Sequence, residues 1–135
     1  MVAFSVYFVV VNPVLEEHFW RRVMRARLEL DMLGPLQRRG SAPRAQLITQ
    51  ADAVSASAYS AYHSVIIASL MPPWFNLGVA FPFLVVCGLF LTKLVDHPRL
   101  GLRTAIAFHS GLDLATACWI LDLRFGWLDH VFAHA

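Results

Sequence analysis

The strongest constraint in this chain is residues 53–92, a stretch that contains no Asp, Glu, Lys or Arg. A single helix of that length would extend about 60 Å, roughly twice the hydrocarbon thickness of a bilayer. The stretch must therefore turn back, and the Pro-Pro-Trp-Phe-Asn segment 72–76 favours a turn in its middle. We expect one membrane span over 54–71 and a second over 76–93, with a kink at Pro82.

The composition indicates an integral membrane protein. Of the 135 residues, 58% are hydrophobic and only 15% are charged, whereas soluble domains carry about 25% charged residues. Disordered, collagen-like and disulfide-rich secreted chains are excluded by the same composition. A third apolar stretch covers 104–121, interrupted by one His and one Asp. The predicted fold is an all-α membrane bundle of three to four membrane helices plus one interfacial helix.

The basic residues are concentrated in one segment. Seven of the eleven Lys and Arg residues are Arg within 21–44, a bias typical of cytoplasmic loops. Acids and leucines are mixed among them, so we expect no nucleic-acid partner. A short amphipathic helix over 22–33 is expected at the membrane surface, and the tail 122–135 at the interface. The loop 93–103 is also basic, and an even number of spans separates it from 21–44, which places both on the cytoplasmic side.

Several polar groups lie inside or beside apolar segments, where a charged side chain costs roughly 2.5–3.5 kcal/mol. Each segment alone has a structural explanation: solvated acids at a helix end, a packing histidine, or a local His–Asp hydrogen bond. Together, three segments offer acids or imidazoles at compatible depths, which predicts convergence on a cavity at the cytoplasmic side of mid-membrane. Pairs four residues apart share a helix face: Glu17 with Arg21, Tyr59 with His63, and His109 with Asp113.

The order of these motifs resembles the CAAX protease and bacteriocin-processing family of intramembrane endopeptidases, related to the CAAX prenyl endoprotease. The family motifs are E-E-x-x-x-R, F-x-x-x-H and H-x-x-x-N or D. They are matched here by Glu16-Glu17 with Arg21, by Tyr59 and His63 with Tyr in place of Phe, and by His109 and Asp113. The similarity covers 12–121, which we expect to be the catalytic core of a single membrane domain 1–135.

The resemblance implies an endopeptidase that cleaves a membrane-associated protein or peptide at a bacterial cytoplasmic membrane. Glu16 and His63 would activate the attacking water, and His109 and Asp113 would hydrogen-bond the oxyanion. An Asp at 113 is a worse donor than Asn unless it is protonated. The remaining motif residues would hold the site together or position the substrate: Glu17, Arg21 and Tyr59.

Cofactor use is left with two alternatives. The family has also been described as metalloproteases, and Glu16, His63 and His109 are the candidate zinc ligands. The sequence contains no H-E-x-x-H motif, so we favour a metal-free glutamate mechanism with no cofactor. Two hypotheses in which the chain is not a protease also remain. It could be an immunity or binding protein on the same scaffold, or a haem protein that uses His63 and His109 as ligands.

The chain is short for the resemblance. Family members usually have several spans before the first motif, and this sequence has none before Glu16. We therefore expect the family's N-terminal spans to be missing here, through truncation or a start codon placed too late. The protein would then be inactive, incomplete, or complemented by oligomerisation that completes the walls of the cavity.

Overall fold

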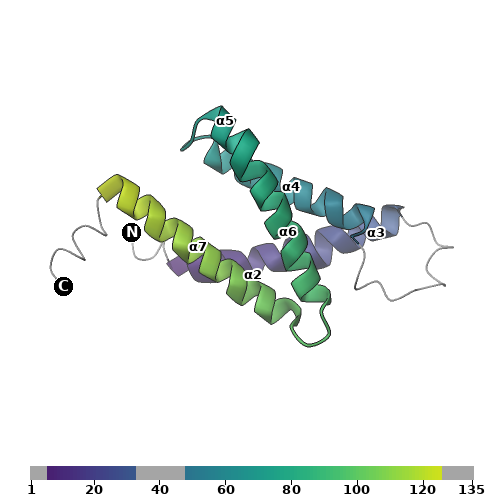
Figure 1. Ribbon diagram of the computed structural model, residues 1–135. Helices are drawn as coiled ribbons and strands as arrows, with labels where there is room; N and C mark the ends of the chain where they lie inside the picture. Colours follow the sequence, from purple (N-terminus) through teal and green to yellow (C-terminus); the bar gives the residue numbers. More distant parts are fainter. Residues whose placement is uncertain (1–5, 33–47, 126–135) are drawn as a thin grey trace.

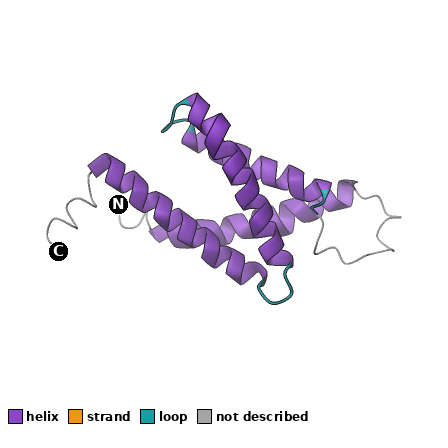
Figure 2. Ribbon diagram, viewed as in Figure 1, coloured by secondary structure: helices purple, strands orange, loops and turns teal. Residues whose placement is uncertain are grey.

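The computed structural model describes residues 6–32 and 48–125, and within these ranges it contains helices and short turns but no strand (Figure 2). The helices form four long rods, which confirms the predicted all-α fold. Residues 126–135 of the predicted interfacial tail, residues 33–44 of the Arg-rich segment and the last residue of the predicted helix 22–33 lie outside the described residues. Residues 122–125 of that tail are instead part of the last helix.

The first rod is a continuous helix rather than the short surface helix predicted over 22–33. It runs through η1 (Tyr7–Val11), α2 (Asn12–Glu17), η2 (His18–Met24) and α3 (Arg25–Met32). Proline lacks the N–H that a helix interior needs, and Pro13 sits in the first turn of α2, directly after the π-helical η1. The wider π turn therefore lets the helix continue through this proline.

The second rod is α4 (Gln50–Ile67), and its start is closed by a reciprocal cap. The Thr49 hydroxyl accepts from the Asp52 backbone N–H at 3.1 Å, while the Asp52 carboxylate accepts from the Thr49 backbone N–H at 3.0 Å. This capping box satisfies two N–H groups that a helix start otherwise leaves unpaired. The helix begins four residues before the start of the predicted span 54–71 and ends four residues before the end of that span.

The third rod joins α5 (Pro73–Phe75), η5 (Asn76–Ala80) and α6 (Phe81–Asp96). Pro82 lies in the first turn of α6, immediately after the π-helical η5. The fourth rod, α7 (Gly101–Phe125), starts at a glycine with φ of +71°, a backbone conformation that glycine adopts without steric cost.

Two of the rods are long and apolar enough to cross a membrane by length and composition: Pro73–Asp96 and Gly101–Asp122. The helix α4, which covers most of the predicted span 54–71, is not among them. It is rich in Ala and Ser and carries Gln50 and Asp52 in its first turn. The described residues thus contain two candidate membrane spans, consistent with a partial helical membrane domain.

Close packing of α4 against α6 forms the centre of the bundle, where the two helices cross diagonally (Figure 1). A methyl group built on Gly88 would lie 3.1 Å from the Ala56 Cβ and 3.3 Å from its Cα. Small residues at a crossing let the backbones approach, which favours helix association in membranes. The rod α7 runs beside α2 and η1, and diverges from α6 beyond the turn that joins them (Figure 1).

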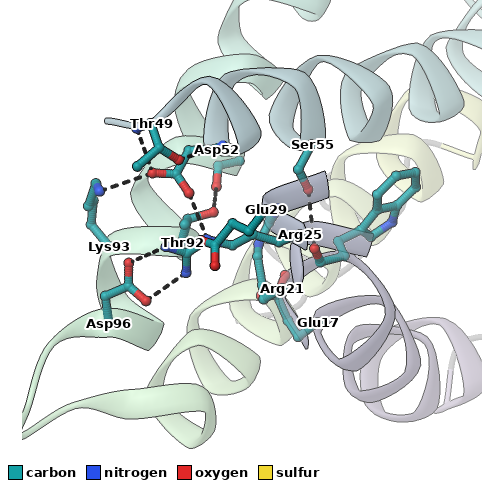
Figure 3. Close-up of polar contacts among 12 residues, drawn as sticks. Glu17, Arg21, Arg25, Glu29, Thr49, Asp52, Ser55, Thr92, Lys93 and Asp96 are labelled. Carbon is teal, nitrogen blue, oxygen red and sulfur yellow. Dashed lines mark hydrogen bonds and ion pairs between the residues drawn. The ribbon is translucent and has the colours of Figure 1, made fainter. Parts of the chain in front are cut away.

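A second contact region, the Arg25 cluster, joins three helices at one end of the bundle (Figure 3). The Arg25 guanidinium donates to both carboxylate oxygens of Asp96, at 2.6 and 2.8 Å, and its Nε lies 2.7 Å from Asp52. The Lys93 ammonium donates to the same Asp52 at 3.3 Å, and Glu29 lies 3.2 Å from Arg25. Because α3, α4 and α6 each contribute a charge, this cluster fixes their relative positions.

Candidate active site

Glu16 lies on α2 with 8% of its surface exposed. One carboxylate oxygen, Oε1, accepts a hydrogen bond from the Asn12 side-chain amide at 2.9 Å. The other, Oε2, faces two imidazoles, 3.4 Å from His63 Nε2 and 3.7 Å from His109 Nε2. The structure thus brings together three side chains that the motifs place on three different helices.

The position of the proton on His63 follows from its neighbour. Its Nδ1 lies 2.9 Å from the backbone carbonyl oxygen of Tyr59. A carbonyl only accepts hydrogen bonds, so Nδ1 must carry the proton. In the neutral ring Nε2 is then a bare lone pair, directed at the Glu16 carboxylate.

His109 is oriented in the same way by a different partner. Its Nδ1 lies 2.9 Å from Glu17 Oε1, and a carboxylate also only accepts, so this nitrogen is the donor. The Tyr59 hydroxyl lies 3.4 Å from Nε2, where it serves as the donor to the ring. Tyr59 therefore touches both histidines, since its own ring packs 4.2 Å from that of His63.

Three acceptor atoms consequently face one another without a proton between them. Glu16 Oε2, His63 Nε2 and His109 Nε2 lie within 4.8 Å of one another. Lone pairs held this close need a donor or a cation between them: a proton on a ring, a water molecule or a metal ion. A water is well sized for this space, because each of its hydrogen bonds spans about 2.8 Å.

Glu17 and Arg21 form a buried pair that supports the cluster. Their side chains are fully buried, and Arg21 Nε lies 3.3 Å from Glu17 Oε2, the pairing that their spacing predicts. The guanidinium carbon also lies 5.0 Å from the centre of the Tyr59 ring. This places a positive charge beside the carboxylate that orients His109, and fixes the tyrosine that touches both rings.

Asp113 is close to the cluster but is not locked to it. Its Oδ1 lies 3.6 Å from His109 Nε2, which is within ion-pair distance but too long for a hydrogen bond. The other oxygen, Oδ2, is buried with no hydrogen-bond partner among the described residues. Only 9% of the residue surface is exposed. The site therefore contains a buried carboxylate that lies beside His109 and Asn12.

The same three acceptors also fit a zinc ion. Zinc bonds of about 2.0–2.1 Å in tetrahedral geometry place ligand atoms about 3.4 Å apart. The two Glu16 distances, 3.4 and 3.7 Å, are close to that spacing. Each histidine donates its Nδ1–H to an oxygen atom, as zinc-bound histidines usually do with the nitrogen that does not bind the metal. A bound zinc would supply a Lewis acid and an acidified water at this position.

Asn12 is a site residue that the sequence motifs do not single out. Its side-chain amide donates a hydrogen bond that fixes one Glu16 oxygen. The signal was present, because Asn12 and Glu16 have the same four-residue spacing as the pairs that were singled out. Ser55, whose hydroxyl donates to the Trp20 carbonyl at 3.1 Å, has no comparable signal.

These helices and this buried carboxylate–imidazole cluster define a helical membrane domain with a candidate hydrolytic centre. A protein-family model described as type II CAAX prenyl endopeptidase Rce1-like matches residues 1–115, most of the chain. The chain belongs to this family, which confirms the resemblance drawn from the motifs and implies a membrane protease. No curated protein and no solved structure matches the chain.

Proposed function

We propose that this chain is an intramembrane endopeptidase in which Glu16 and His63 together activate the water that attacks a peptide bond. One observation carries the proposal. Glu16 Oε2 and His63 Nε2 lie 3.4 Å apart in a buried site, and both atoms are hydrogen-bond acceptors. One water can donate a hydrogen to each of them. Its oxygen lone pairs then stay free for attack on a carbonyl carbon.

The steps balance in protons. As the water oxygen bonds to the carbonyl carbon, one water proton passes to Glu16 or His63 and the carbonyl oxygen becomes an oxyanion. When the C–N bond breaks, that proton passes to the leaving nitrogen, which gives a carboxylic acid and an amine. The acid then passes its proton to the amine, so the final products are a carboxylate and an ammonium group. A carboxylate beside an imidazole suits this relay because either group can hold the proton between the two steps.

The oxyanion needs hydrogen-bond donors, and the candidate residues differ in the protonation state in which they can donate. The Tyr59 hydroxyl has one proton, which it donates to the neutral His109 ring, and it becomes free to donate to the oxyanion once His109 Nε2 is protonated. His109 becomes a donor at Nε2 once it is protonated, and Glu17, 2.9 Å from Nδ1, stabilises that imidazolium. Asp113 donates only when it is protonated. The proposal therefore gives His109 and Tyr59 the larger share of oxyanion stabilisation, and Asp113 a secondary one.

A matched pair of variants tests the proposal. Wild type, Glu16→Gln and Asp31→Asn are expressed in membranes, and new peptide termini in the membrane proteome are mapped by mass spectrometry. Asp31 is the control because it is an exposed acid on the same continuous helix. We expect the same new termini with wild type and Asp31→Asn, and none with Glu16→Gln. Termini that persist with Glu16→Gln would contradict the proposal, and no termini with wild type would favour the immunity or binding reading.

The zinc-dependent version is the second candidate, because the Glu16, His63 and His109 atoms have ligand spacing. It assigns the same residues and the same bond cleavage but requires the ion. We place the site in a bacterial cytoplasmic membrane with the Arg25 cluster toward the cytoplasm, as the Arg-rich segment 21–44 suggests.

A further inference from the structure

The candidate active site is closed on one side and more open on another. His109 and Glu17, which lie 2.9 Å apart, have only 2% and 0% of their side chains exposed. The exposed fraction is 18% for the His63 side chain, 12% for Asp113 and 9% for Glu16. A polypeptide that reaches the Glu16 carboxylate therefore approaches from the side on which His63 lies.

Tyr62 lies at this open side. It directly precedes His63 in α4, and the two rings are perpendicular, with their centroids 5.1 Å apart. The Tyr62 ring also packs 6.2 Å from the ring of Trp20. These two contacts orient the phenol, yet 46% of the residue surface stays exposed. Tyr62 thus combines an oriented ring with an accessible surface at the edge of the site.

A second tyrosine, Tyr7, lies near Tyr62 on the first rod. Tyr62 interacts electrostatically with both Tyr7 and the Glu16 carboxylate, which places the two phenols near each other beside the site. Tyr7 is also about half exposed. A phenol hydroxyl is both a hydrogen-bond donor and an acceptor. The open side of the site therefore offers two such groups, one from each of two helices.

A membrane-embedded substrate needs such groups where it is cut. In a bilayer, a helical substrate pairs its backbone N–H and C=O groups internally. The helix has to unwind around the scissile bond before water can attack the carbonyl carbon, because the helical turns shield that atom. Unwinding frees backbone N–H and C=O groups, and leaving them unpaired in an apolar setting is costly. A hydroxyl can accept from a freed N–H or donate to a freed C=O.

We propose that Tyr62 and Tyr7 bind the unwound backbone of the substrate beside the scissile bond, through one hydrogen bond each. They hold the polypeptide against the Glu16–His63 pair and recognise its peptide groups rather than a particular side chain. The proposal rests on the function proposed above, since it needs a scissile bond at Glu16.

The test removes only the hydroxyl groups. Tyr62→Phe and Tyr7→Phe keep the rings and their packing, and Ser69→Ala, the control, removes an exposed hydroxyl beyond the end of α4. The probe is a synthetic peptide that spans one Glu16-dependent cleavage site, and thermal unfolding checks that each variant is folded. We expect each phenylalanine to raise KM about 2- to 10-fold, the usual effect of one lost hydrogen bond, with kcat unchanged. Ser69→Ala is expected to match wild type.

A second series of peptides identifies the group that each hydroxyl contacts. Replacing one backbone amide by an ester removes an N–H and weakens the carbonyl as an acceptor. We expect the ester at the contacted position to raise KM with the wild-type protein and to have much less effect with Tyr62→Phe. Such coupling between two changes indicates a direct interaction, as in a double-mutant cycle.

Phenylalanine variants with the wild-type KM would overturn the proposal and would mean that the two phenols face water or lipid headgroups, as interfacial aromatic residues do. Ester effects that are equal in wild type and in both variants would overturn it as well. Both results leave the protease in place. An absence of Glu16-dependent cleavage would instead overturn the proposed function, and the roles of Tyr62 and Tyr7 with it.

Discussion

At the scale of single residues, the neighbours of each imidazole decide the chemistry of the site. The Tyr59 carbonyl and the Glu17 carboxylate each take the Nδ1 proton of one histidine, at 2.9 Å in both cases. His63 Nε2 is thereby left as a bare acceptor that faces Glu16, and His109 Nε2 as the acceptor for the Tyr59 hydroxyl. The motifs identify these residues, but only the folded structure shows which nitrogen faces which oxygen.

The first residue-scale prediction concerns Asn12 as a positioning residue. Asn12→Ala removes the 2.9 Å hydrogen bond to Glu16 Oε1 and frees the carboxylate to rotate away from the imidazoles. We expect kcat to fall about 10–100-fold, as for other residues that orient a reacting group, with KM little changed. The measurement is the cleavage rate against substrate concentration. Val14→Ala, an exposed position on the same helix, is the control, and equal rates for the two variants would refute the role of Asn12.

A second residue-scale prediction separates the two versions of the mechanism. If Glu16 and His63 activate water without a metal, treatment of the purified protein with a strong chelator leaves the cleavage rate unchanged. Metal analysis then finds no zinc at stoichiometric level. Activity that is lost on chelation and restored by zinc would establish the zinc-dependent version instead.

At the scale of elements, the apolar pattern predicted the helices well but not their ends. It placed spans over 76–93 and 104–121, and the structure has helices over Pro73–Asp96 and Gly101–Phe125. It failed most at the first rod, where it predicted only a short helix over 22–33 and the structure has a continuous helix from Tyr7 to Met32. The π-helical segments before Pro13 and Pro82 explain the continuity, and no periodicity in the sequence announces them.

The element-scale prediction concerns the crossing of α4 and α6. A methyl group at Gly88 would meet the Ala56 Cβ at 3.1 Å, whereas one at Gly78 would meet nothing within 4 Å. We expect Gly88→Ala to be less stable than Gly78→Ala by about 1–3 kcal/mol, the usual cost of overpacking. Both changes carry the same helix-propensity gain of roughly 1 kcal/mol. Thermal unfolding in detergent measures the difference, and equal stabilities would show that the helices separate freely.

At the scale of the whole molecule, the Arg25 cluster is the feature that sequence reasoning could not find. Arg25 and Asp96 are 71 residues apart, so no local spacing connects them. The charge pattern predicts only that the arginines of 21–44 lie on the cytoplasmic side, with those of 22–33 on a helix at the membrane surface. The structure instead places Arg25 between two helices as a partner of Asp52 and Asp96 (Figure 3). Tertiary contact had to be seen before this arginine could be told apart from its neighbours.

The whole-molecule prediction is a loss of stability that depends on pH. Burial alone would raise the pKa of Asp52, but the Thr49 backbone N–H and the Arg25 and Lys93 cations outweigh burial and hold that pKa below its ordinary value of 3.8. A depressed pKa in the folded state contributes stability above the unfolded value, and this contribution is lost as the pH falls through the folded value. We therefore expect the stability gap between wild type and Asp52→Asn to be full at neutral pH and to close below about pH 4.

The cation at the centre of this cluster gives a companion measurement at neutral pH. Arg25→Met leaves two carboxylates without their main partner, and we expect it to destabilise the fold by about 3 kcal/mol. Arg27→Met, an exposed arginine on the same helix, is the control and should unfold close to wild type. Equal losses for the two variants would mean that the cluster does not hold the helices together.

The most direct test of the central claim is a double-mutant cycle on Glu16 and His63, with the cleavage rate of a substrate identified from the new termini. If the two side chains act on one water, Glu16→Gln and His63→Gln each slow cleavage by about 10²–10⁴-fold, the usual loss for a general base. The double variant should then be little slower than the more damaged single variant, because residues that act as a unit are not additive. Losses that multiply in the double variant, or a Glu16→Gln protein that cleaves at the wild-type rate, would contradict the account.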